Sequence, residues 1–497
     1  MRDTLALLLS DGYKQVHNRQ YPEGTELLVS YLTPRKSRLL NQDKMVFFGL
    51  QAFCKKYLME YFDENFFSLP EETVREEYTR VVDVMLGKGN CDVDKVIELH
   101  RLGYLPLEIW AVPEGSLVPM GVPCIEIHNT HPDFAWVVQW VESLLSSEIW
   151  KPCIHAGVGY LYRKIVDKYY GLTVDNGKNC KAISDFGFRG MSCLQEATKA
   201  SAAWLCSFSG SATIPAATYL ERYYNCNITK DDVVTNAIST EHSVMAANFS
   251  VDGNERDFIK RLLTEIYPNA SFSMVSDTYD YWNLVDNILP TLKDEIMTHN
   301  GKLLVRPDSG DIVEISIETI KHLWNIFGGT INSKGYKVLD PHIGCVYGDG
   351  VTQNRANTIY QKLMDAGFAA NNIVFGAGSF SFACLEEDNG ILNPYTRDTY
   401  SVAVKATAGV VDGKYIPIFK DPKTDRVAGH NFKKSQRGFC SVTYNENGEL
   451  QFKDGFDSFQ HDNTAMKKVF GVDGSENKQY NTETIHEIRN RLHNNNF

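Results

Sequence analysis

The chain has 497 residues, of which 43% are hydrophobic and 23% are charged, a composition that is ordinary for a soluble globular protein and excludes an intrinsically disordered one. This length predicts roughly three hydrophobic cores rather than one small domain. The formal net charge of −12 argues against a protein whose main role is to coat nucleic acid or an anionic membrane. Any anionic ligand must therefore be bound by locally clustered cations.

The apolar runs and the cysteines indicate the compartment. The run at residues 5–9 lies between Asp3 and Asp11 and lacks the pattern of a signal peptide. No stretch approaches the ~20 apolar residues that a membrane span needs. The 11 cysteines are scattered and form no Cys-x-x-Cys pair, which disfavours a disulfide framework and a structural zinc site. We expect a cytoplasmic protein with reduced thiols and with no nucleic-acid or membrane partner.

The two ends of the chain read as one mixed α/β region. In the first 150 residues we expect helices over 46–62 and 71–86 and strands over 27–32 and 105–112. After about residue 405 the sequence returns to short strands and turns, and we expect this tail to complete the N-terminal region. The predicted domains are therefore 1–150 joined by 400–497, and 151–399.

The middle of the chain carries a series of short apolar runs that end abruptly in polar or glycine-rich loops. These runs are 181–184, 234–239, 272–276, 302–306, 343–348 and 372–376. Their spacing suits repeated βα units and predicts parallel strands. In an α/β barrel the loops after the carboxyl ends of the strands carry the active site, and here they are rich in Asp, Arg, His and Gly. An open three-layer sheet is the alternative, because periodicity alone does not show closure.

Two of these loops combine groups that suit a flat, phosphorylated ligand. Phe186 and Arg189 lie three residues apart in the loop 184–190, so a planar ring could stack there while its polar substituent is held. The loop 306–311 combines Arg306 with Asp308 and Asp311, which suits a magnesium-bound phosphate or a ribose diol. Taken alone, each loop could also be a core aromatic residue with a surface ion pair, or an ordinary turn.

Other candidates are weaker when taken singly. The glycine pairs in 348–350 and 376–379 expose backbone N–H groups, as phosphate-binding nests do. His242, beside Glu241, could accept a phosphoryl group, act as a base or be structural. Three cations that would by default be surface charges lie on or beside apolar runs, namely Arg397, Lys405 and Lys420.

The common catalytic signatures are missing. The sequence has no Gly-x-x-x-x-Gly-Lys-Ser/Thr loop and no Gly-x-Gly-x-x-Gly after a strand. It also has no recognisable Ser/His/Asp set and no His-Glu-x-x-His motif. The remaining set of cations, nests, carboxylates and an aromatic ring favours a substrate that carries several phosphate charges and a flat ring.

In their order, these motifs resemble the nicotinamide phosphoribosyltransferase family, and the resemblance covers nearly the whole chain. It is carried by residues 11–14, 20–22, 112–115, 184–190, 240–243, 275–280, 306–310, 348–350 and 419–422. It implies a type II phosphoribosyltransferase fold, with an α/β barrel joined to a mixed domain built from both chain ends. It also implies a homodimer with active sites at the subunit interface. The implied reaction transfers the phosphoribosyl group of phosphoribosyl pyrophosphate to nicotinamide for NAD synthesis.

The resemblance also implies roles for individual residues. Phe186 and Tyr13 of the partner subunit would stack on the two faces of the nicotinamide ring. Arg189 and Arg306 would hold the carboxamide region and the phosphoribosyl end, and Asp277 and Asp308 would address the ribose, Mg²⁺ pyrophosphate or both. The 5′-phosphate would lie in a cradle formed by Gly348, Asp349, Gly378 and Ser379.

The remaining implied roles concern phosphate groups and the walls of the site. Arg397, Lys405 and Lys420 would bind pyrophosphate or the phosphates of ATP. His242 would be phosphorylated when ATP hydrolysis is coupled to turnover. Four further residues are counted among the substrate-binding positions: Asp185, Ala212, Glu241 and Ser273. Mg²⁺ and ATP are the implied cofactor and coupled substrate.

The sequence departs from the family at two places. Ala212 stands where the family has an acidic residue that faces the carboxamide, which leaves both nicotinamide and nicotinate as candidate substrates. The stretch 380–395 is longer than the usual connection to Arg397. Two other readings remain, a non-catalytic binding or signalling protein on the same scaffold and an unrelated barrel enzyme that acts on sugar phosphates.

Overall fold

The computed structural model describes the chain except for residues 1–2, 40–41, 177–178, 387–389, 424–433 and 496. The chain forms two compact units rather than the roughly three that its length suggests. Unit 1 comprises Met1–Ile154, Leu220–Cys226 and Tyr395–Asn495. Unit 2 comprises His155–Tyr219, Asn227–Pro394 and Asn496–Phe497. Both ends of the chain therefore contribute to unit 1.

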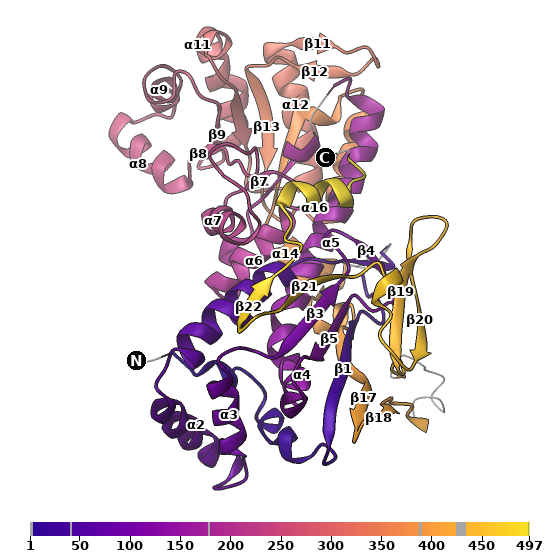
Figure 1. The fold of residues 1–497 in the computed structure, drawn as a ribbon. Coiled ribbons are helices and arrows are strands. Elements are labelled where there is room, and N and C mark those ends of the chain that lie inside the picture. The colour runs from indigo at the N-terminus through magenta and orange to yellow at the C-terminus, as the bar shows by residue number, and fades with distance from the viewer. Residues whose placement is uncertain (1–2, 40–41, 177–178, 387–389, 424–433, 496) are drawn as a thin grey trace. The chain divides into compact units, whose positions relative to one another are not determined.

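Unit 1 is built on a seven-stranded antiparallel sheet with the order β18-β17-β1-β5-β3-β21-β22 (Figure 1). Its strands are β1 (Thr25–Thr33), β3 (Leu107–Ala111), β5 (Ile125–Asn129), β17 (Ala403–Val411), β18 (Lys414–Pro417), β21 (Lys467–Asp473) and β22 (Glu476–Gln479). The tail strand β17 pairs with β1 so that Thr33 faces Ala403, and β21 pairs with β3. Segments about 380 residues apart in the sequence therefore share one sheet.

The other elements of unit 1 are helices and two small hairpins. Its helices include α1 (Leu50–Phe53), which a π-helical stretch extends over Cys54–Tyr61, α2 (Glu71–Leu86), α3 (Val93–Leu102), α4 (Val137–Trp140) and α16 (Ile485–Leu492). In α2 the buried residues Val74, Tyr78 and Val82 recur every fourth position, which is the spacing of one helix face. Two short hairpins stand apart from the main sheet, β2 (Lys44–Val46) with β4 (Leu117–Pro119) and β19 (Phe439–Tyr444) with β20 (Leu450–Phe456).

Unit 2 is built on seven parallel strands in the order β7-β6-β14-β13-β10-β9-β8 (Figure 1). They are β6 (Ile183–Asp185), β7 (Gly210–Ser211), β8 (Ile238–Ser239), β9 (Phe272–Val275), β10 (Leu303–Arg306), β13 (Ile343–Tyr347) and β14 (Ile373–Ala377). A single parallel bridge joins Gly210 of β7 to Thr235, just before β8, so the two edges of the curled sheet meet. The predicted α/β barrel class is confirmed, and six of its seven strands follow the predicted runs.

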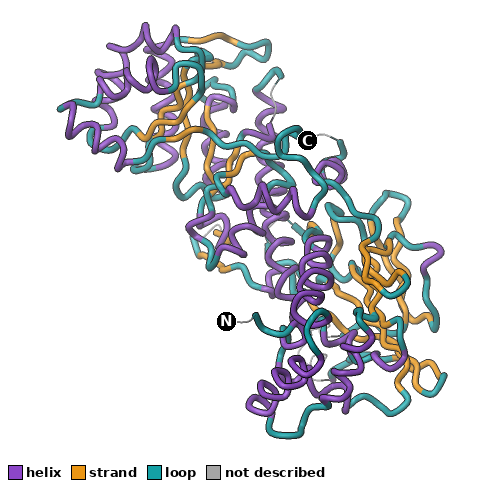
Figure 2. The backbone as a smooth tube through the Cα atoms, turned by 60° about the vertical axis from the view of Figure 1, so that its left-hand side comes forward, coloured by secondary structure: helices purple, strands orange, loops and turns teal. Residues whose placement is uncertain are grey.

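Helices alternate with these strands, and Figure 2 shows them flanking the strands within the unit. They include α6 (Leu194–Trp204), α7 (Ile214–Tyr223), α8 (His242–Asp252), α9 (Arg256–Arg261), α10 (Tyr281–Asn283), α11 (Lys293–Thr298), α12 (Ile312–Phe327), α13 (Gln353–Asp365) and α14 (Ser379–Ala383), while the long α5 (Glu142–Thr173) begins in unit 1. None of the helices in the described part of the chain combines the length and apolarity that a bilayer crossing requires.

Two local features bear on the sequence predictions. Asp311 is the N-cap of α12, where its carboxylate accepts hydrogen bonds from Val313 N at 3.0 Å and Glu314 N at 2.9 Å. Its charge therefore stabilises the start of a helix, so of the two carboxylates in this loop Asp308 is the one left for a ligand. In the long stretch 380–395, β15 (Cys384–Glu386) and β16 (Leu392–Pro394) form a hairpin, and residues 387–389 lie outside the described part.

Candidate active site

A cavity of about 500 Å³ opens at the carboxyl ends of the unit 2 strands. Its walls come from the carboxyl ends of β6, β7, β10, β13 and β14 and the segments that follow them, because parallel strands bring these ends to one edge. Strand β8 and the two residues before it complete the wall. The lining residues are Phe186, Phe188, Arg189, Ala212, Asn236, Ala237, Ser239, Arg306, Asp308, Gly348, Asp349, Gly378 and Ser379. We call this space the barrel cavity.

The aromatic wall of the barrel cavity depends on two glycines. The backbone N–H of Phe186 donates to Ala377 O at 2.8 Å, which fixes the loop after β6 to β14. A Cβ atom on Gly348 would lie 2.8 Å from the ring of Phe186, and one on Gly376 would be closer still. These glycines therefore let the ring lie flat against two neighbouring strands.

Asp185 lies beneath the barrel cavity rather than on its wall. Its side chain is fully buried and accepts hydrogen bonds from Gly187 N at 2.7 Å, Ser211 Oγ at 2.7 Å and Thr213 Oγ1 at 3.1 Å. Burial raises the pKa of the Asp185 carboxyl, although these hydrogen bonds act in the opposite direction. Asp185 therefore braces the loops on either side of it, and its carboxylate is not among the groups that line the cavity.

Ala212 stands directly above this brace. Its backbone N–H donates to Asp185 O at 2.9 Å, and its methyl group lines the barrel cavity. The carboxylates on the cavity wall, among the described residues, are those of Asp308 and Asp349. Position 212, where the resemblance implies an acidic residue, thus presents only a methyl group to the cavity.

Acidic groups surround His242 at the start of α8. Nε2 of His242 lies 3.6 Å from Oδ2 of Asp308 and 3.9 Å from Oδ1 of Asp277. Nδ1 of the same ring lies 3.2 Å from Thr278 Oγ1. The His242 side chain is half exposed, so its ring is both oriented by neighbours and open to a reactant. Glu241, the N-cap of α8, is exposed beside it.

Asp277 and Arg306 are largely buried and only partly satisfied. Oδ2 of Asp277 accepts hydrogen bonds from Asp308 N at 3.0 Å and Ser309 Oγ at 2.5 Å, whereas Oδ1 is buried without a partner. Arg306 donates to Thr240 O at 2.9 Å, and its Nε is likewise buried without a partner. Burial lowers the pKa of the Arg306 guanidinium. Buried polar atoms that lack a partner are costly, so both side chains are primed to bind a polar ligand.

Ser273, like Asp277 and Arg306, has a buried polar atom without a hydrogen-bond partner. It lies on β9, is buried, and its Oγ has no hydrogen-bond partner. Its backbone carbonyl accepts from Thr240 N at 3.0 Å, so it lies under the same strand ends as Arg306. Nine of the predicted residues from unit 2 line the barrel cavity: Phe186, Arg189, Ala212, Arg306, Asp308, Gly348, Asp349, Gly378 and Ser379. His242 and Asp277 contact Asp308 from outside that lining, whereas Asp185 and Ser273 are buried.

Four predicted residues belong to unit 1. Tyr13 is 57% exposed, and Arg397 is exposed and paired with Asp398 at 3.3 Å. Lys405 and Lys420 line a cavity of about 330 Å³, which we call the basic cavity. Lys405 also donates to Glu142 at 3.1 Å. The basic cavity gives the last two residues a shared setting that the sequence did not reveal.

The basic cavity contains cations that sequence reasoning missed. Besides Lys405 and Lys420, its lining among the described residues includes Arg35, Lys434 and the carboxylate of Asp454. Thr33, which also lines it, is 2% exposed, and its Oγ1 has no hydrogen-bond partner. Arg35 lies two positions after Thr33, the last residue of β1. In an extended chain this spacing of two puts both side chains on one face, so the sequence could have indicated that they lie together. Lys434 gives no such signal, because it belongs to an irregular segment.

The acidic groups near His242 meet part of the requirement for Mg²⁺. Carboxylate oxygens suit this ion, and Oδ1 of Asp277 is buried without a partner. Across the described residues there is no group of three or more His, Cys, Asp or Glu side chains that could hold a metal by themselves. The residues therefore fit an ion that takes most of its ligands from substrate phosphates and water.

Comparison with known proteins gives matches over nearly the whole chain. The profile of the nicotinate phosphoribosyltransferase (NAPRTase) family matches residues 181–471, and that of the nicotinamide phosphoribosyltransferase N-terminal domain matches residues 5–109. Nicotinamide phosphoribosyltransferase of Acinetobacter baylyi is 38% identical, over 97% of this chain and 96% of the relative. The enzyme of the same name from Xanthomonas campestris is 32% identical, over 87% of this chain and 86% of the relative.

Solved structures support the fold. Nicotinate-nucleotide pyrophosphorylase from Pyrococcus furiosus matches with a TM-score of 0.56 and 12% identity, over 99% of this chain and 96% of that one. Human nicotinic acid phosphoribosyltransferase matches with a TM-score of 0.54 and 13% identity, over 97% and 92% of the two chains. The predicted enzyme class is thereby confirmed: the chain belongs to the nicotinate phosphoribosyltransferase family, within its nicotinamide phosphoribosyltransferase branch.

Proposed function

We propose that this chain transfers the phosphoribosyl group of phosphoribosyl pyrophosphate to nicotinamide, releasing nicotinamide mononucleotide and pyrophosphate for NAD salvage. Relatives that bear the name nicotinamide phosphoribosyltransferase, at 38% and 32% identity, support the reaction. The observation that carries the assignment in this chain is the barrel cavity, whose lining combines Phe186 and Arg189 with Arg306 and Asp308. An aromatic face and a phosphoribosyl-binding set thus share one space.

Nicotinamide binding follows from the aromatic wall. The ring of Phe186 offers a flat face against which a pyridine can stack, and Arg189 offers hydrogen-bond donors to the carboxamide oxygen. Ala212 and Asn236 line the same cavity. We propose that the enzyme is a homodimer in which Tyr13 of the partner subunit covers the other ring face.

Catalysis in this site needs little proton transfer. The pyridine nitrogen is already a neutral nucleophile, so the chain must stabilise positive charge at the ribose carbon and negative charge on the departing pyrophosphate. Asp277 and Asp308 supply carboxylates to the ribose, and Arg306 supplies a guanidinium to the phosphoribosyl end. The backbone of Gly348 and Gly378 forms the cradle for the 5′-phosphate.

Two groups of residues are candidates for binding phosphate charges. Asp277 and Asp308 are the residues that would hold the ion with the substrate. When bound, Mg²⁺ neutralises phosphate charge and orients the leaving group. We propose that Lys405, Lys420 and the newly found Lys434 bind the pyrophosphate or the phosphates of ATP.

ATP is the proposed coupled substrate, and His242 is the proposed phosphoryl acceptor. Its half-exposed ring is oriented by Thr278 through a 3.2 Å contact between the hydroxyl and Nδ1, which leaves Nε2 toward Asp277 and Asp308. Phosphorylation at Nε2 would place negative charge beside these carboxylates, where a cation is needed to offset the repulsion. Mg²⁺ or Arg306 supplies that charge.

One assay tests the proposal and its nearest alternative. The purified chain is incubated with phosphoribosyl pyrophosphate, Mg²⁺ and either nicotinamide or nicotinate, and the mononucleotide is measured. We expect nicotinamide mononucleotide as the product. Nicotinate mononucleotide as the main product would favour the nicotinate enzyme, an alternative kept open by Ala212. Absence of both products from a folded protein would overturn the catalytic proposal in favour of a non-catalytic binding protein.

A further inference from the structure

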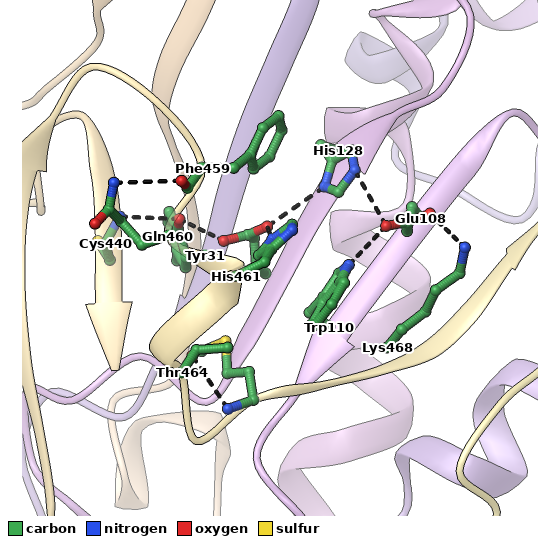
Figure 3. Close-up of polar contacts among 12 residues, drawn as sticks. Tyr31, Glu108, Trp110, His128, Cys440, Phe459, Gln460, His461, Thr464 and Lys468 are labelled. Atoms are coloured by element: carbon green, nitrogen blue, oxygen red, sulfur yellow. Dashed lines mark hydrogen bonds and ion pairs between the residues drawn. The ribbon is translucent and has the colours of Figure 1, made fainter. Parts of the chain in front are cut away.

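A polar cluster lies on one face of the unit 1 sheet, outside both cavities (Figure 3). Tyr31 on β1, Glu126 on β5 and Trp110 on β3 are register partners across three neighbouring strands. Register partners present their side chains on the same face of a sheet. Among the remaining members, His128 and Glu108 are also register partners, while Lys468 comes from β21 and His461 from the segment that follows β20.

Glu126 is the centre of this cluster. It is only 2% exposed, and it accepts hydrogen bonds from Tyr31 Oη at 2.6 Å and His461 Nε2 at 2.7 Å. His128 Nδ1 lies 3.4 Å away. Burial would raise the pKa of the Glu126 carboxyl, but contacts with His128, His461 and Tyr31 outweigh it and lower the pKa to about 2. Glu126 is thus a buried anion that accepts hydrogen bonds from Tyr31 and His461, which are far apart in the sequence, while His128 lies close to it on the same strand.

The cluster contains more carboxylates than permanent cations. His128 lies between Glu126 and Glu108, with its Nε2 3.7 Å from Glu108 Oε1. Lys468 donates to Glu108 at 2.6 Å, and Trp110 Nε1 donates to the same carboxylate at 2.7 Å. Two carboxylates therefore face one lysine when both imidazoles are neutral. One proton on either imidazole balances the charge.

His461 joins the cluster to the β19–β20 hairpin. Its ring stacks on Trp110, with 3.9 Å between ring centroids and 14° between planes. Close by, Cys440 N on β19 donates to Tyr31 Oη at 3.0 Å. Three residues beyond His461, Thr464 Oγ1 donates to Val442 O of β19 at 3.1 Å. Both the start of the hairpin and the segment that follows it are thus tied to the cluster.

The same hairpin forms a wall of the basic cavity. Phe452 and Asp454 of β20 line it, and so do the residues that lead into β19. Ser435, in the segment before β19, forms two hydrogen bonds with Lys420. Its backbone N–H donates to Lys420 O at 3.0 Å, and its Oγ accepts from Lys420 N at 2.8 Å. The positions of Lys420 and Lys434 therefore depend on where the start of β19 is held.

We propose that the Tyr31–Glu126–His461 cluster is a proton-linked clamp that positions the hairpin wall of the basic cavity and so tunes its affinity for polyphosphate. His461 is a positioning residue, because it touches no ligand itself. The inference rests on the proposed function of the basic cavity as a polyphosphate site. A proton on the imidazole of His461 or His128 strengthens the contacts to Glu126 and Glu108, so the clamp tightens when either ring is protonated.

The test measures binding of inorganic pyrophosphate by calorimetry at pH 6 and pH 8 to the full chain. His461→Ala removes both the hydrogen bond and the charge, and we expect about tenfold weaker binding at pH 6. His461→Gln keeps a donor to Glu126 but cannot titrate. It should bind nearly as the wild type does at pH 8 and lose the extra affinity at pH 6. Because pyrophosphate itself titrates, the decisive quantity is the change in the pH 8 to pH 6 ratio between variant and wild type.

Two further variants locate the effect. His131→Ala removes a histidine of the same unit that lies 3.8 Å from a carboxylate, that of Asp133, and lines neither cavity, so it should bind pyrophosphate as the wild type does. Lys434→Ala should weaken binding without altering the pH ratio. Under saturating phosphoribosyl pyrophosphate, the His461 variants should keep kcat and the KM for nicotinamide. When phosphoribosyl pyrophosphate is varied instead, its KM should rise.

The possible failures are distinct. Wild-type affinity and pH ratio in a folded His461→Ala or His461→Gln variant would overturn the clamp and leave the proposed function intact. Absence of pyrophosphate binding by the wild type, or binding that Lys434→Ala does not alter, would overturn the polyphosphate role of the basic cavity and the clamp with it. An equal response in His131→Ala would show that the change is not specific to the cluster, which also overturns it.

Discussion

The carboxylate of Asp277 accepts a hydrogen bond from the backbone N–H of Asp308, with 3.0 Å between Oδ2 and the nitrogen. Asp277 therefore holds the loop after β10, while its second oxygen, buried and unpartnered, is left for a ligand. We expect Asp277→Ala to lower kcat/KM by a factor of several hundred, about 3–4 kcal/mol, as for other lost electrostatic contacts to a transition state. Steady-state kinetics of the mononucleotide-forming reaction measure this loss.

Arg306→Ala should cause a loss of the same size, because its half-buried guanidinium lines the barrel cavity and is the proposed cation for the phosphoribosyl end. Asp286→Asn is the matched control. Asp286 pairs with His322 at 2.6 Å on the same unit and does not line the barrel cavity, so this variant should keep normal kinetics. Near-normal turnover in a folded Asp277→Ala or Arg306→Ala variant would show that the catalytic assignment of that residue is wrong.

Phe186→Ala should weaken nicotinamide binding much more than phosphoribosyl pyrophosphate binding. It removes one stacking face, worth on the order of 1 kcal/mol beyond burial. Gly376→Ala should also weaken nicotinamide binding, since the added methyl group would displace the Phe186 ring that packs against this glycine. The measurement is the KM of Phe186→Ala for nicotinamide and for phosphoribosyl pyrophosphate. An equal rise in both KM values would contradict the stacking role of Phe186.

His242 should carry an acid-labile phosphoryl group after incubation with labelled ATP and Mg²⁺. The label should be absent from His242→Ala, while slow phosphoribosyl transfer without ATP persists, because the phosphohistidine assists the transfer and does not lie on its covalent path. His342→Ala is a suitable control, since this histidine pairs with Asp340 at 2.7 Å and lines neither cavity. Label retained in His242→Ala would place the acceptor elsewhere.

Hydrophobic periodicity predicted the strands that build the barrel cavity, but it could not find them all. The six apolar runs correspond to β6, β8, β9, β10, β13 and β14, because buried parallel strands need continuous apolar residues. The seventh strand, Gly210–Ser211, has only two residues, too few for any periodic pattern. Closure of the sheet through Thr235 is a tertiary contact that no local pattern encodes.

The site was only partly visible in the sequence for a similar reason. Residue type and loop position identified Phe186, Arg189 and Arg306, all of which line the barrel cavity. Asp185 stands in the same loop, yet its carboxylate points into Ser211 and Thr213, a difference that depends on one side-chain orientation. The basic cavity brings residues of β1 next to a segment 400 positions away, and such proximity follows from sheet pairing rather than from spacing.

Stability in acid should depend on Glu126. Its folded pKa of about 2 lies below the ordinary value of 4.5, so the deprotonated form stabilises the fold above about pH 4.5, and this stabilisation is lost as the pH falls toward 2. The shift corresponds to about 3 kcal/mol. Urea unfolding of wild type and Glu126→Gln should therefore differ at pH 7 and converge near pH 2. Glu449→Gln, at an exposed ion pair with Lys44, should show little difference at either pH, and a gap for Glu126→Gln that does not narrow in acid would contradict the role of its charge.

Ala212→Asp should sharpen the preference for nicotinamide over nicotinate. The backbone of Ala212 is fixed to Asp185 O and its methyl group lines the barrel cavity, so an aspartate there would place a carboxylate on the wall beside the proposed ring site. At roughly 4 Å and an effective dielectric constant near 20, two like charges repel by about 4 kcal/mol, enough in principle for a nearly thousandfold bias against nicotinate. The wild type lacks this repulsion while Arg189 can still pair with a carboxylate, so we expect it to accept nicotinate more readily than the variant does.

The test measures kcat/KM for both substrates in wild type, Ala212→Asp and the uncharged Ala212→Asn. This comparison separates the effect of the new charge from that of the larger side chain, because only the aspartate should change the ratio strongly. If the ratio stays the same in all three proteins, the discriminating group lies elsewhere in the cavity, and Asp308 and Asp349, the two carboxylates already on its wall, become the next positions to vary.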